Sequence, residues 1–334
     1  MLTTADIYHR QVVLLNTLEN KYHLCIIQGN LVIKNNDEIL TRISKQQAFA
    51  VMVIGNCSIT SVMIDYCQKY GIALVLLNSR LRPILFASLS GEANFLLRQK
   101  QYLSTKIIHQ KIANHLVYNK IYNHIQLIKN IRQKDDIIKK SIIDLSDYQD
   151  KCYGMEQLDG LMGIEGNAAR MYFKCYFGQL KHHTWQSRKP RLKIDPINVV
   201  LDMGYTLLFN YMEANLRLFG FDVYKGMLHQ LWFKRKSLVC DFVEPFRCII
   251  DRQVLIAFNL GQFRSEHFSQ VKMQYQLKNK HSKEYHAILM KSIIEYKMEI
   301  FIYVRDFYRA IMKMSENNID VPLPLFDINI KHQE

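Results

Sequence analysis

The sequence predicts an α+β fold in which a small N-terminal β-rich domain precedes a larger all-α domain. Short apolar and β-branched runs separated by turn residues fill the first part of the chain, and helical spacing of apolar residues fills the rest. The 334 residues are 49% hydrophobic, which is enough to fill a substantial core. We therefore expect two domains, over residues 1–90 and 91–334.

A β-hairpin is expected to open the first domain. Residues 22–27 and 31–34 are rich in strand-forming residues. Gly29-Asn30 lies between them and supplies the positive φ angle that a tight turn requires.

The remainder of the first domain is predicted to hold buried strands and one helix. Apolar runs predict strands over residues 48–54 and 72–77. Between them we expect a helix that Ser58 caps and Gly71 ends. A last strand is predicted over residues 83–88.

Helices are expected to dominate after residue 91, where apolar residues recur at spacings of three and four. Residues 135–150 mix charges with turn formers, so we expect a loop or the end of a helix there. Further on, Asp195 can cap a helix whose first residue is Pro196, and this helix is predicted to run to Gly220.

The charge of the chain favours a polyanionic partner. Lys and Arg exceed Asp and Glu by 44 to 30, and a net charge of +14 favours binding to phosphate polyanions or to an anionic membrane surface. Residues 93–134 carry eight Lys or Arg and no Asp or Glu. A single run of charge is commonly a solvated helix face, but the complete absence of acids favours a phosphate-facing surface.

No segment indicates export or membrane insertion. The sequence lacks the roughly 18 uninterrupted apolar residues of a membrane span, and its start lacks the charged-then-apolar order of a secretion signal. The seven cysteines are scattered and include no CxxC pair, so we expect reduced thiols. We accordingly expect a cytoplasmic protein that does not bind a membrane.

Glu165 is the first candidate for a metal ligand. Small residues around it would leave one side of a helix free for close approach by another element. Ala169 and Tyr172 share its stripe, so the carboxylate interrupts an apolar face, where burial is costly without a positive partner. A metal ion could supply that charge, and so could a structural partner such as Arg170.

A second acidic cluster lies further along the chain. Asp241, Glu244 and Arg247 are spaced three apart and so share one helix face, which Asp251 extends. Two acids this close repel each other unless a cation lies between them, which favours a divalent ion over isolated ion pairs. Pro245 is expected to kink this helix, because proline removes an internal hydrogen bond.

His229 precedes Glu244 by fifteen residues, and by itself it is a weak candidate because most histidines are not ligands. Four motifs in order, however, resemble those of the CRISPR-associated adaptation integrase family. They are Glu165-Gly166-Asn167-Ala168-Ala169-Arg170; Lys189-Pro190-Arg191 with Asp195-Pro196-Ile197-Asn198 and Gly204-Tyr205; Gly220-Phe221-Asp222 with Gly226-Met227-Leu228-His229; and Ser237-Leu238 through Arg247. Val223 departs from the pattern, since the family usually has proline there.

The resemblance implies that Glu165, His229 and Glu244 bind one divalent cation and that Asp241 supports them as a further catalytic acid. Two carboxylates and one imidazole suit Mn²⁺ or Mg²⁺. The implied protein is a metal-dependent DNA endonuclease and integrase of CRISPR adaptation. In its reaction, the 3′-hydroxyl of a short captured DNA attacks the CRISPR repeat by transesterification, without ATP. The second domain would be catalytic and would bind double-stranded and branched DNA.

Five basic residues flank the acidic site and are candidates for holding DNA phosphates, although each could instead pair with a nearby acid. They are Arg170, Arg188, Lys189, Arg191 and Arg247. The resemblance also implies a homodimer, with residues 1–90 as the expected dimerisation region. It further implies a second, small CRISPR-associated adaptation protein as partner.

Two alternatives stay open on the residues alone. In the first, the chain is a non-catalytic basic DNA-binding scaffold whose three proposed ligands only make internal ion pairs. In the second, it is a metal-dependent hydrolase of small molecules, and its positive charge is incidental. Ligand variants test the first alternative, and the salt dependence of DNA binding tests the second.

Overall fold

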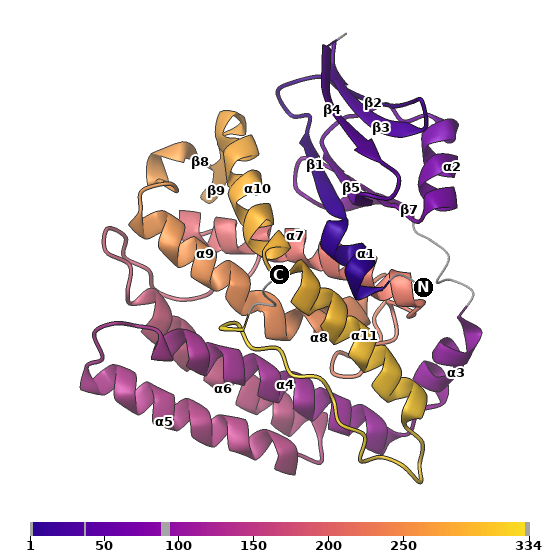
Figure 1. The fold of residues 1–334 in the computed structure, drawn as a ribbon. Coiled ribbons are helices and arrows are strands. Elements are labelled where there is room, and N and C mark those ends of the chain that lie inside the picture. Colours follow the sequence, from indigo (N-terminus) through magenta and orange to yellow (C-terminus); the bar gives the residue numbers. More distant parts are fainter. Residues whose placement is uncertain (1–2, 37, 88–93, 331–334) are drawn as a thin grey trace.

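A computed structural model describes residues 3–36, 38–87 and 94–330 (Figure 1). A strand-rich N-terminal part is followed by a larger helical part, which confirms the α+β class. The expected boundary at residues 90 and 91 lies outside the described residues, so the division into two domains stays a prediction.

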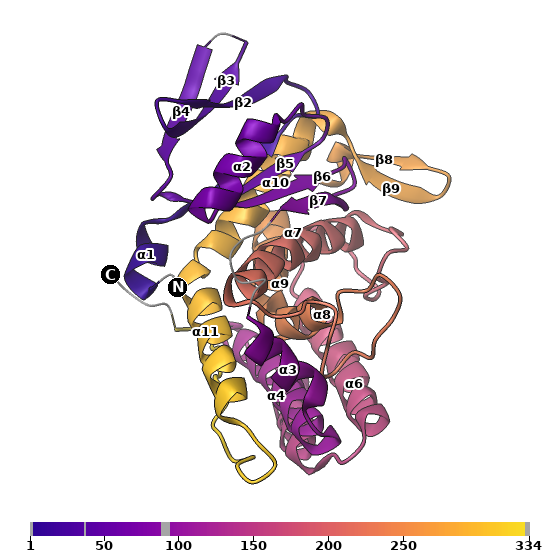
Figure 2. The same cartoon turned by 90° about the vertical axis from the view of Figure 1, so that its right-hand side faces the viewer.

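Two sheets make up the N-terminal part (Figure 2). The first has the strand order β1-β5-β6-β7, and the second is antiparallel with the order β2-β3-β4. The strands are β1 (Gln11–Asn16), β2 (Tyr22–Ile27), β3 (Asn30–Asn35), β4 (Glu38–Ser44), β5 (Ala48–Ile54), β6 (Ala73–Leu77) and β7 (Pro83–Ala87). Every residue of β5 is buried between parallel neighbours, which explains its continuously apolar sequence.

The predicted hairpin is present, but its turn is shifted by one residue. Gln28 and Gly29 occupy the turn with φ angles of 50° and 71°. The expected Gly29-Asn30 turn is therefore wrong, because Asn30 already pairs with Ile27 in the ladder.

The predicted helix and flanking strands are also confirmed, with corrected ends. Helix α2 (Ser61–Tyr70) is capped by Thr60, whose side chain accepts from the Met63 N–H, and not by Ser58. Gly71 ends it with φ 79°, as expected. The predicted strand over residues 83–88 is β7, and its last residue, 88, lies outside the described part. Helix α1 (Thr4–His9), β1 and β4 were not predicted.

The helical part is built around α4, most of whose residues are buried. Helices α5 and α6 pack against it, as do α8, the 3₁₀ turn η3 (Glu244–Phe246) and α9 (Figure 1). The helices are α3 (Phe95–Leu103), α4 (Lys106–Lys129), α5 (Asp136–Lys151), α6 (Leu158–Phe177), α7 (Pro196–Phe219), α8 (Ser237–Val243), α9 (Arg247–Asn259), α10 (Asn279–Ile294) and α11 (Lys297–Lys313).

Helix α7 begins and ends as predicted. The Asp195 side chain accepts from the Asn198 N–H, and Gly220 ends the helix with φ 89°. The expected loop or helix end over residues 135–150 is wrong, because α5 covers residues 136–150. Asp135 acts there as an N-cap and accepts from the Ile138 N–H, so an apparent turn former starts a helix.

Pro245 interrupts its helix as expected. The short turn η3 (Glu244–Phe246) separates α8 from α9 and carries Glu244 at its start. A hairpin of β8 (Phe268–Val271) and β9 (Gln274–Leu277) was not predicted in the helical part. Across the described ranges, no helix is long and apolar enough to span a membrane.

Candidate functional site

Three side chains from three separate elements meet at one point. Glu165 lies on α6, Glu244 on η3 and Lys120 on α4. Lys120 Nζ donates to Glu165 Oε1 and, at 2.6 Å, to Glu244 Oε2. The structure therefore brings together two of the predicted ligands, around a cation that the sequence did not single out.

This cluster is strongly electrostatic. Arg247 adds an ion pair of 3.0 Å to Glu244 Oε1. Burial alone would raise the pKa of Glu244, but Arg247 and Lys120 outweigh it and lower this pKa to about 2. Burial likewise opposes the charge of Lys120, yet Glu165 and Glu244 raise its pKa. Glu244 and Lys120 are therefore both charged at neutral pH.

His229 and Asp241 form a second unit. His229 Nδ1 lies 2.7 Å from Asp241 Oδ1. The buried carboxylate of Asp241 also accepts the backbone N–H groups of Met227, Leu228 and His229 at 2.6, 3.0 and 2.9 Å. Since Nδ1 faces this carboxylate, Nε2 is the ring nitrogen left to bind a ligand.

Gly226 makes the loop before His229 possible. A Cβ atom at this position would lie 2.6 Å from the His229 carbonyl oxygen and 2.9 Å from Asp241 Oδ2. Gly163 and Gly166 differ, because an added Cβ there meets nothing within 4 Å. The expectation that small residues near Glu165 admit another element is therefore wrong at these two positions.

The donor chemistry of the cluster fits a hard divalent ion. Glu165 and Glu244 already converge on one cation, Lys120, and carboxylate oxygens are the usual ligands of Mg²⁺ and Mn²⁺. His229 presents an imidazole whose other nitrogen is held by a carboxylate, as is usual for metal-bound histidines. Among the described residues, however, no three His, Cys, Asp or Glu side chains are arranged to hold a metal.

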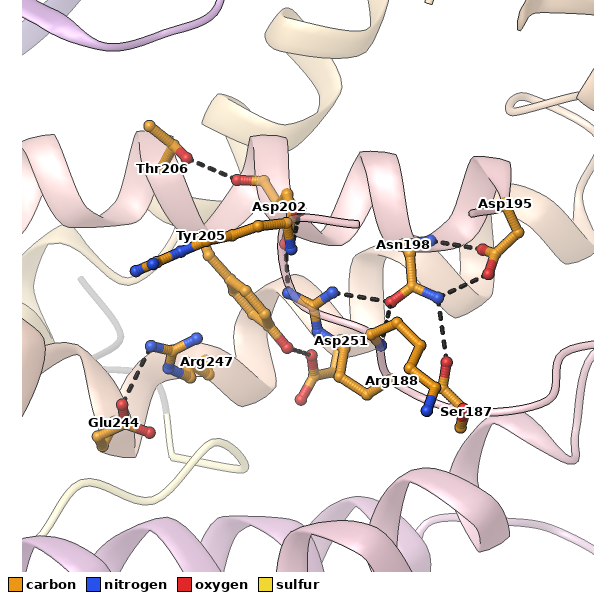
Figure 3. A network of polar contacts seen from close by, with 12 residues as sticks. Ser187, Arg188, Asp195, Asn198, Asp202, Tyr205, Thr206, Glu244, Arg247 and Asp251 are labelled. Atoms are coloured by element: carbon orange, nitrogen blue, oxygen red, sulfur yellow. Dashed lines mark hydrogen bonds and ion pairs between the residues drawn. The ribbon is translucent and has the colours of Figure 1, made fainter. Parts of the chain in front are cut away.

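A polar network beside the cluster holds a loop over α7 (Figure 3). Arg188 forms an ion pair with Asp202 and donates to Asn198 Oδ1 at 2.8 Å. Asp202 Oδ2 in turn accepts the Arg191 backbone N–H at 2.9 Å. Arg188 therefore pairs with an acid inside the protein, which is the alternative role that the sequence left open for the flanking cations.

Tyr205 links this network to Asp251. Its hydroxyl and that of Tyr172 donate to the two oxygens of the buried Asp251 carboxylate. The Arg247 guanidinium lies over the Tyr205 ring, 4.6 Å from its centre. Burial raises the pKa of Asp251 to about 6, although the two hydroxyls and Arg247 lower it. Asp251 is thus held by two tyrosine hydroxyls, and one of these tyrosines also contacts Arg247.

An open cavity of about 1670 Å³ reaches Glu165 and Glu244. All five candidate DNA-binding residues line it, and His229 does not. Among its charged lining residues, cations outnumber acids. The further cations are Arg80, Arg82, Lys120, Lys174 and Lys193, and the acids are Glu165, Asp202, Glu244 and Asp251. Arg170, Lys189 and Arg191 are exposed, and no ion pair to them is found among the described residues.

In the acid-free stretch over residues 93–134, half of the eight cations have partners inside the protein. Arg98, Lys100 and Lys111 donate to backbone carbonyls, and Lys120 is buried against the two glutamates. A uniform phosphate-facing surface is therefore wrong for these four cations. Their partners lie in distant segments, which a count of charges does not reveal.

The loop after His229 exposes a run of large apolar residues. The exposed fractions of Leu231, Trp232 and Phe233 are 58%, 76% and 83%. Lys234 Nζ lies 5.1 Å from the centre of the Phe233 ring. Exposed aromatic rings beside cations are typical of surfaces on which unpaired bases stack.

Comparison with known proteins places these features in a family. The model of the family described as CRISPR associated protein Cas1 matches residues 16–290. The CRISPR-associated endonuclease Cas1 1 of Thermodesulfovibrio yellowstonii is 30% identical over 232 residues, which cover 65% of this chain and 71% of that protein.

Solved structures share the fold. A Cas1 protein from Thermotoga maritima superposes with a TM-score of 0.77 at 17% identity, over 91% of this chain and 98% of that one. A chain of a Cas6-RT-Cas1–Cas2 complex gives a TM-score of 0.78 at 22% identity, over 95% of this chain and 36% of that one.

Proposed function

This chain belongs to the Cas1 family, and from that premise we propose that it is a divalent-metal-dependent DNA endonuclease and integrase of CRISPR adaptation. The observation that carries the proposal is the convergence of Glu165 and Glu244 at a cavity whose charged lining residues are mostly cations. Carboxylates that converge at a surface suited to phosphates are the oxygen ligands that Mg²⁺ and Mn²⁺ prefer, which supports metal-dependent chemistry at this cavity.

In this proposal Glu165, Glu244 and His229 Nε2 hold Mn²⁺ or Mg²⁺, and Asp241 orients the imidazole. The bound ion would supply Lewis acidity, which polarises a phosphodiester and stabilises the oxygen that leaves. The nucleophile is the 3′-hydroxyl of the captured DNA. The protein's own groups orient this strand and hold its phosphates, so that joining proceeds by transesterification.

Arg170, Lys189 and Arg191 are the proposed phosphate contacts, because their side chains are exposed at the cavity. Arg188 and Arg247 also line the cavity, but each has an internal carboxylate partner and is therefore less available to a phosphate. The exposed rings of Trp232 and Phe233 lie on the loop that follows His229 and suit unpaired bases.

We also propose that the chain acts as a homodimer through residues 1–90 and assembles with the small adaptation protein Cas2. The support is the fold shared with a chain whose structure is described as a Cas6-RT-Cas1–Cas2 complex. Light scattering of the full chain, alone and mixed with Cas2, tests both assemblies.

The decisive experiment is a DNA cleavage and joining assay on branched DNA with Mn²⁺. Glu165→Ala, His229→Ala and Glu244→Ala should each abolish product while duplex binding survives. Glu316→Ala, which removes an exposed glutamate, is the control and should leave the rate unchanged. Full activity in the three variants would leave the non-catalytic scaffold as the better account.

The salt dependence of duplex affinity separates the nucleic-acid proposal from a small-molecule hydrolase. Three or more phosphate contacts should give a steep loss of affinity with salt, by a factor of about 30 or more between 50 and 200 mM. Replacing Arg170, Lys189 and Arg191 by alanine should flatten the slope by about three, while Lys139→Ala on α5 should not. A flat response in the parent would contradict DNA binding.

A further inference from the structure

Lys120 is an unusual lysine, since its side chain is buried and two carboxylates surround its ammonium. With Arg247 it balances Glu165 and Glu244, so the four side chains together are neutral. Two histidines interact electrostatically with the same cluster: His124, which lies on the same helix and whose pKa burial lowers well below its usual value, and His229. The two carboxylates of the cluster are therefore already balanced by two cations without a metal ion.

Three carboxylate oxygens of this cluster already accept from cations. Lys120 Nζ binds Glu165 Oε1 and Glu244 Oε2, and Arg247 binds Glu244 Oε1. A Mg²⁺ ligand oxygen lies at about 2.0–2.1 Å from the ion and Nζ lies 2.6 Å from Glu244 Oε2, so both cations cannot share the position between the carboxylates. A second cation entering a neutral, poorly solvated cluster would also meet direct repulsion from the first.

We propose that Lys120 is an internal counter-ion that holds the cation position of the metal-free protein and competes with the divalent ion for Glu165 and Glu244. The inference rests on the proposed metal site and adds a residue that no ligand motif contains. Lys120 also lines the cavity, so its displaced ammonium can bind a DNA phosphate. DNA and metal therefore bind cooperatively, because DNA gives the displaced lysine a new partner.

A structural ion pair with no bearing on metal binding is the rival interpretation, and metal affinity separates the two. Binding of Mn²⁺ to the full chain is measured by electron paramagnetic resonance for the parent, Lys120→Met, Lys120→Arg and Lys111→Met. Lys111 lies on the same helix but binds a backbone carbonyl and Asp320 at the surface, so its variant is the matched control.

Lys120→Met should bind Mn²⁺ at least tenfold more tightly than the parent, and Lys111→Met should match the parent. Lys120→Arg keeps the charge and should stay close to the parent. In EDTA, Lys120→Met should melt below the parent and regain its stability on addition of Mn²⁺. Duplex DNA should raise the Mn²⁺ affinity of the parent by a larger factor than that of Lys120→Met.

A wild-type measurement keeps the inference testable if Lys120→Met does not fold. Acetylation of Lys120 by a lysine reagent, followed by mass spectrometry, should accelerate when Mn²⁺ is added, while Lys111 labelling stays constant. Unchanged or weaker Mn²⁺ binding in Lys120→Met, or constant Lys120 labelling while Mn²⁺ binds, overturns the inference and leaves the metal site standing. Absence of Mn²⁺ binding in every protein overturns both.

Discussion

His229 Nδ1 lies 2.7 Å from Asp241 Oδ1, and the same carboxylate accepts three backbone N–H groups of the loop that carries His229. Both oxygens of Asp241 thus accept hydrogen bonds from this loop, and its side chain is fully buried. Asp241 therefore acts on the histidine and is not positioned as a metal ligand.

Asp241→Asn should impair both stability and activity. An amide offers one accepting oxygen where the carboxylate offers two, so at least one buried backbone N–H loses its partner, at a cost of about 1–3 kcal/mol. The imidazole also loses the anion that fixes its tautomer, which should lower the DNA-joining rate by about 10–100-fold. Urea unfolding and a joining assay measure the two effects.

His229→Ala serves as the comparison, because it removes the ring and leaves the loop hydrogen bonds in place. It should abolish joining with little loss of stability. Equal destabilisation by both substitutions would contradict a structural role of Asp241 in the loop.

Gly226→Ala should disrupt the same loop through packing alone. Its Cβ would lie 2.6 Å from the His229 carbonyl oxygen and 2.8 Å from Ser237 Cβ, where backbone and a buried helix start cannot give way. We expect a lower melting temperature and loss of joining. Gly163→Ala is the control, since its Cβ meets open space in a helix interior and should stabilise by about 0.5–1 kcal/mol. Normal melting of Gly226→Ala would show that the loop is adaptable.

Local signals in the sequence predicted those parts of the fold that local interactions determine. Asp195 with Pro196 and Gly220 define both ends of α7, because caps act within a few residues. Strand β1 was missed because its partner, β5, begins more than thirty residues later, and pairing at that distance leaves no local pattern. Asp135 was misread because the same side chain starts turns and helices.

The candidate site shows the same division. Ordered motifs singled out Glu165 and Glu244, and the structure places them around one ammonium. Lys120 was counted as one charge in a basic stretch, because its partners lie 45 and 124 residues away. A lysine in a nearly continuous buried helix face was the available signal, and it became informative once the fold showed which face is buried.

Asp251 should make stability fall as pH rises from about 4 to about 6. Burial raises its pKa to about 6 from the usual value of 3.8, so the folded protein holds a proton that the unfolded chain releases in this window. This contribution is full below pH 4, and it is lost as pH rises through 6, by at most about 3 kcal/mol. Glu244 behaves oppositely, since its pKa of about 2 contributes stability that is lost only in acid.

Asp251→Asn isolates this effect, because the amide does not titrate and can still bond to Tyr172 and Tyr205. Urea unfolding of both proteins at pH 4, 5, 6 and 7 gives the difference directly. The free energy of unfolding of the variant should rise relative to that of the parent as pH rises to 6. Above pH 6 the difference between the two proteins should stay constant. Parallel curves across this range would show that Asp251 ionises as readily in the fold as in the unfolded chain.

The segment before the C-terminus braces the turn that carries Glu244. Phe326 stacks on Phe246, two residues after Glu244, with ring centres 4.2 Å apart. Its backbone N–H and carbonyl pair with the Asn119 side chain at 2.9 and 2.7 Å, next to Lys120. Phe326→Ala should cost about 3–5 kcal/mol of unfolding free energy, because it empties a buried aromatic site.

Phe326→Ala should also slow joining at temperatures where the variant is fully folded, since Phe246 then loses the ring that holds η3 in place. Leu325→Ala is the matched control, because this neighbour is 46% exposed and should change neither property appreciably. Circular dichroism melts and joining rates at a common low temperature separate the two effects. A destabilised Phe326→Ala with an unchanged rate would limit the segment to holding the fold, and Glu244 would then be positioned by Lys120 and Arg247 alone.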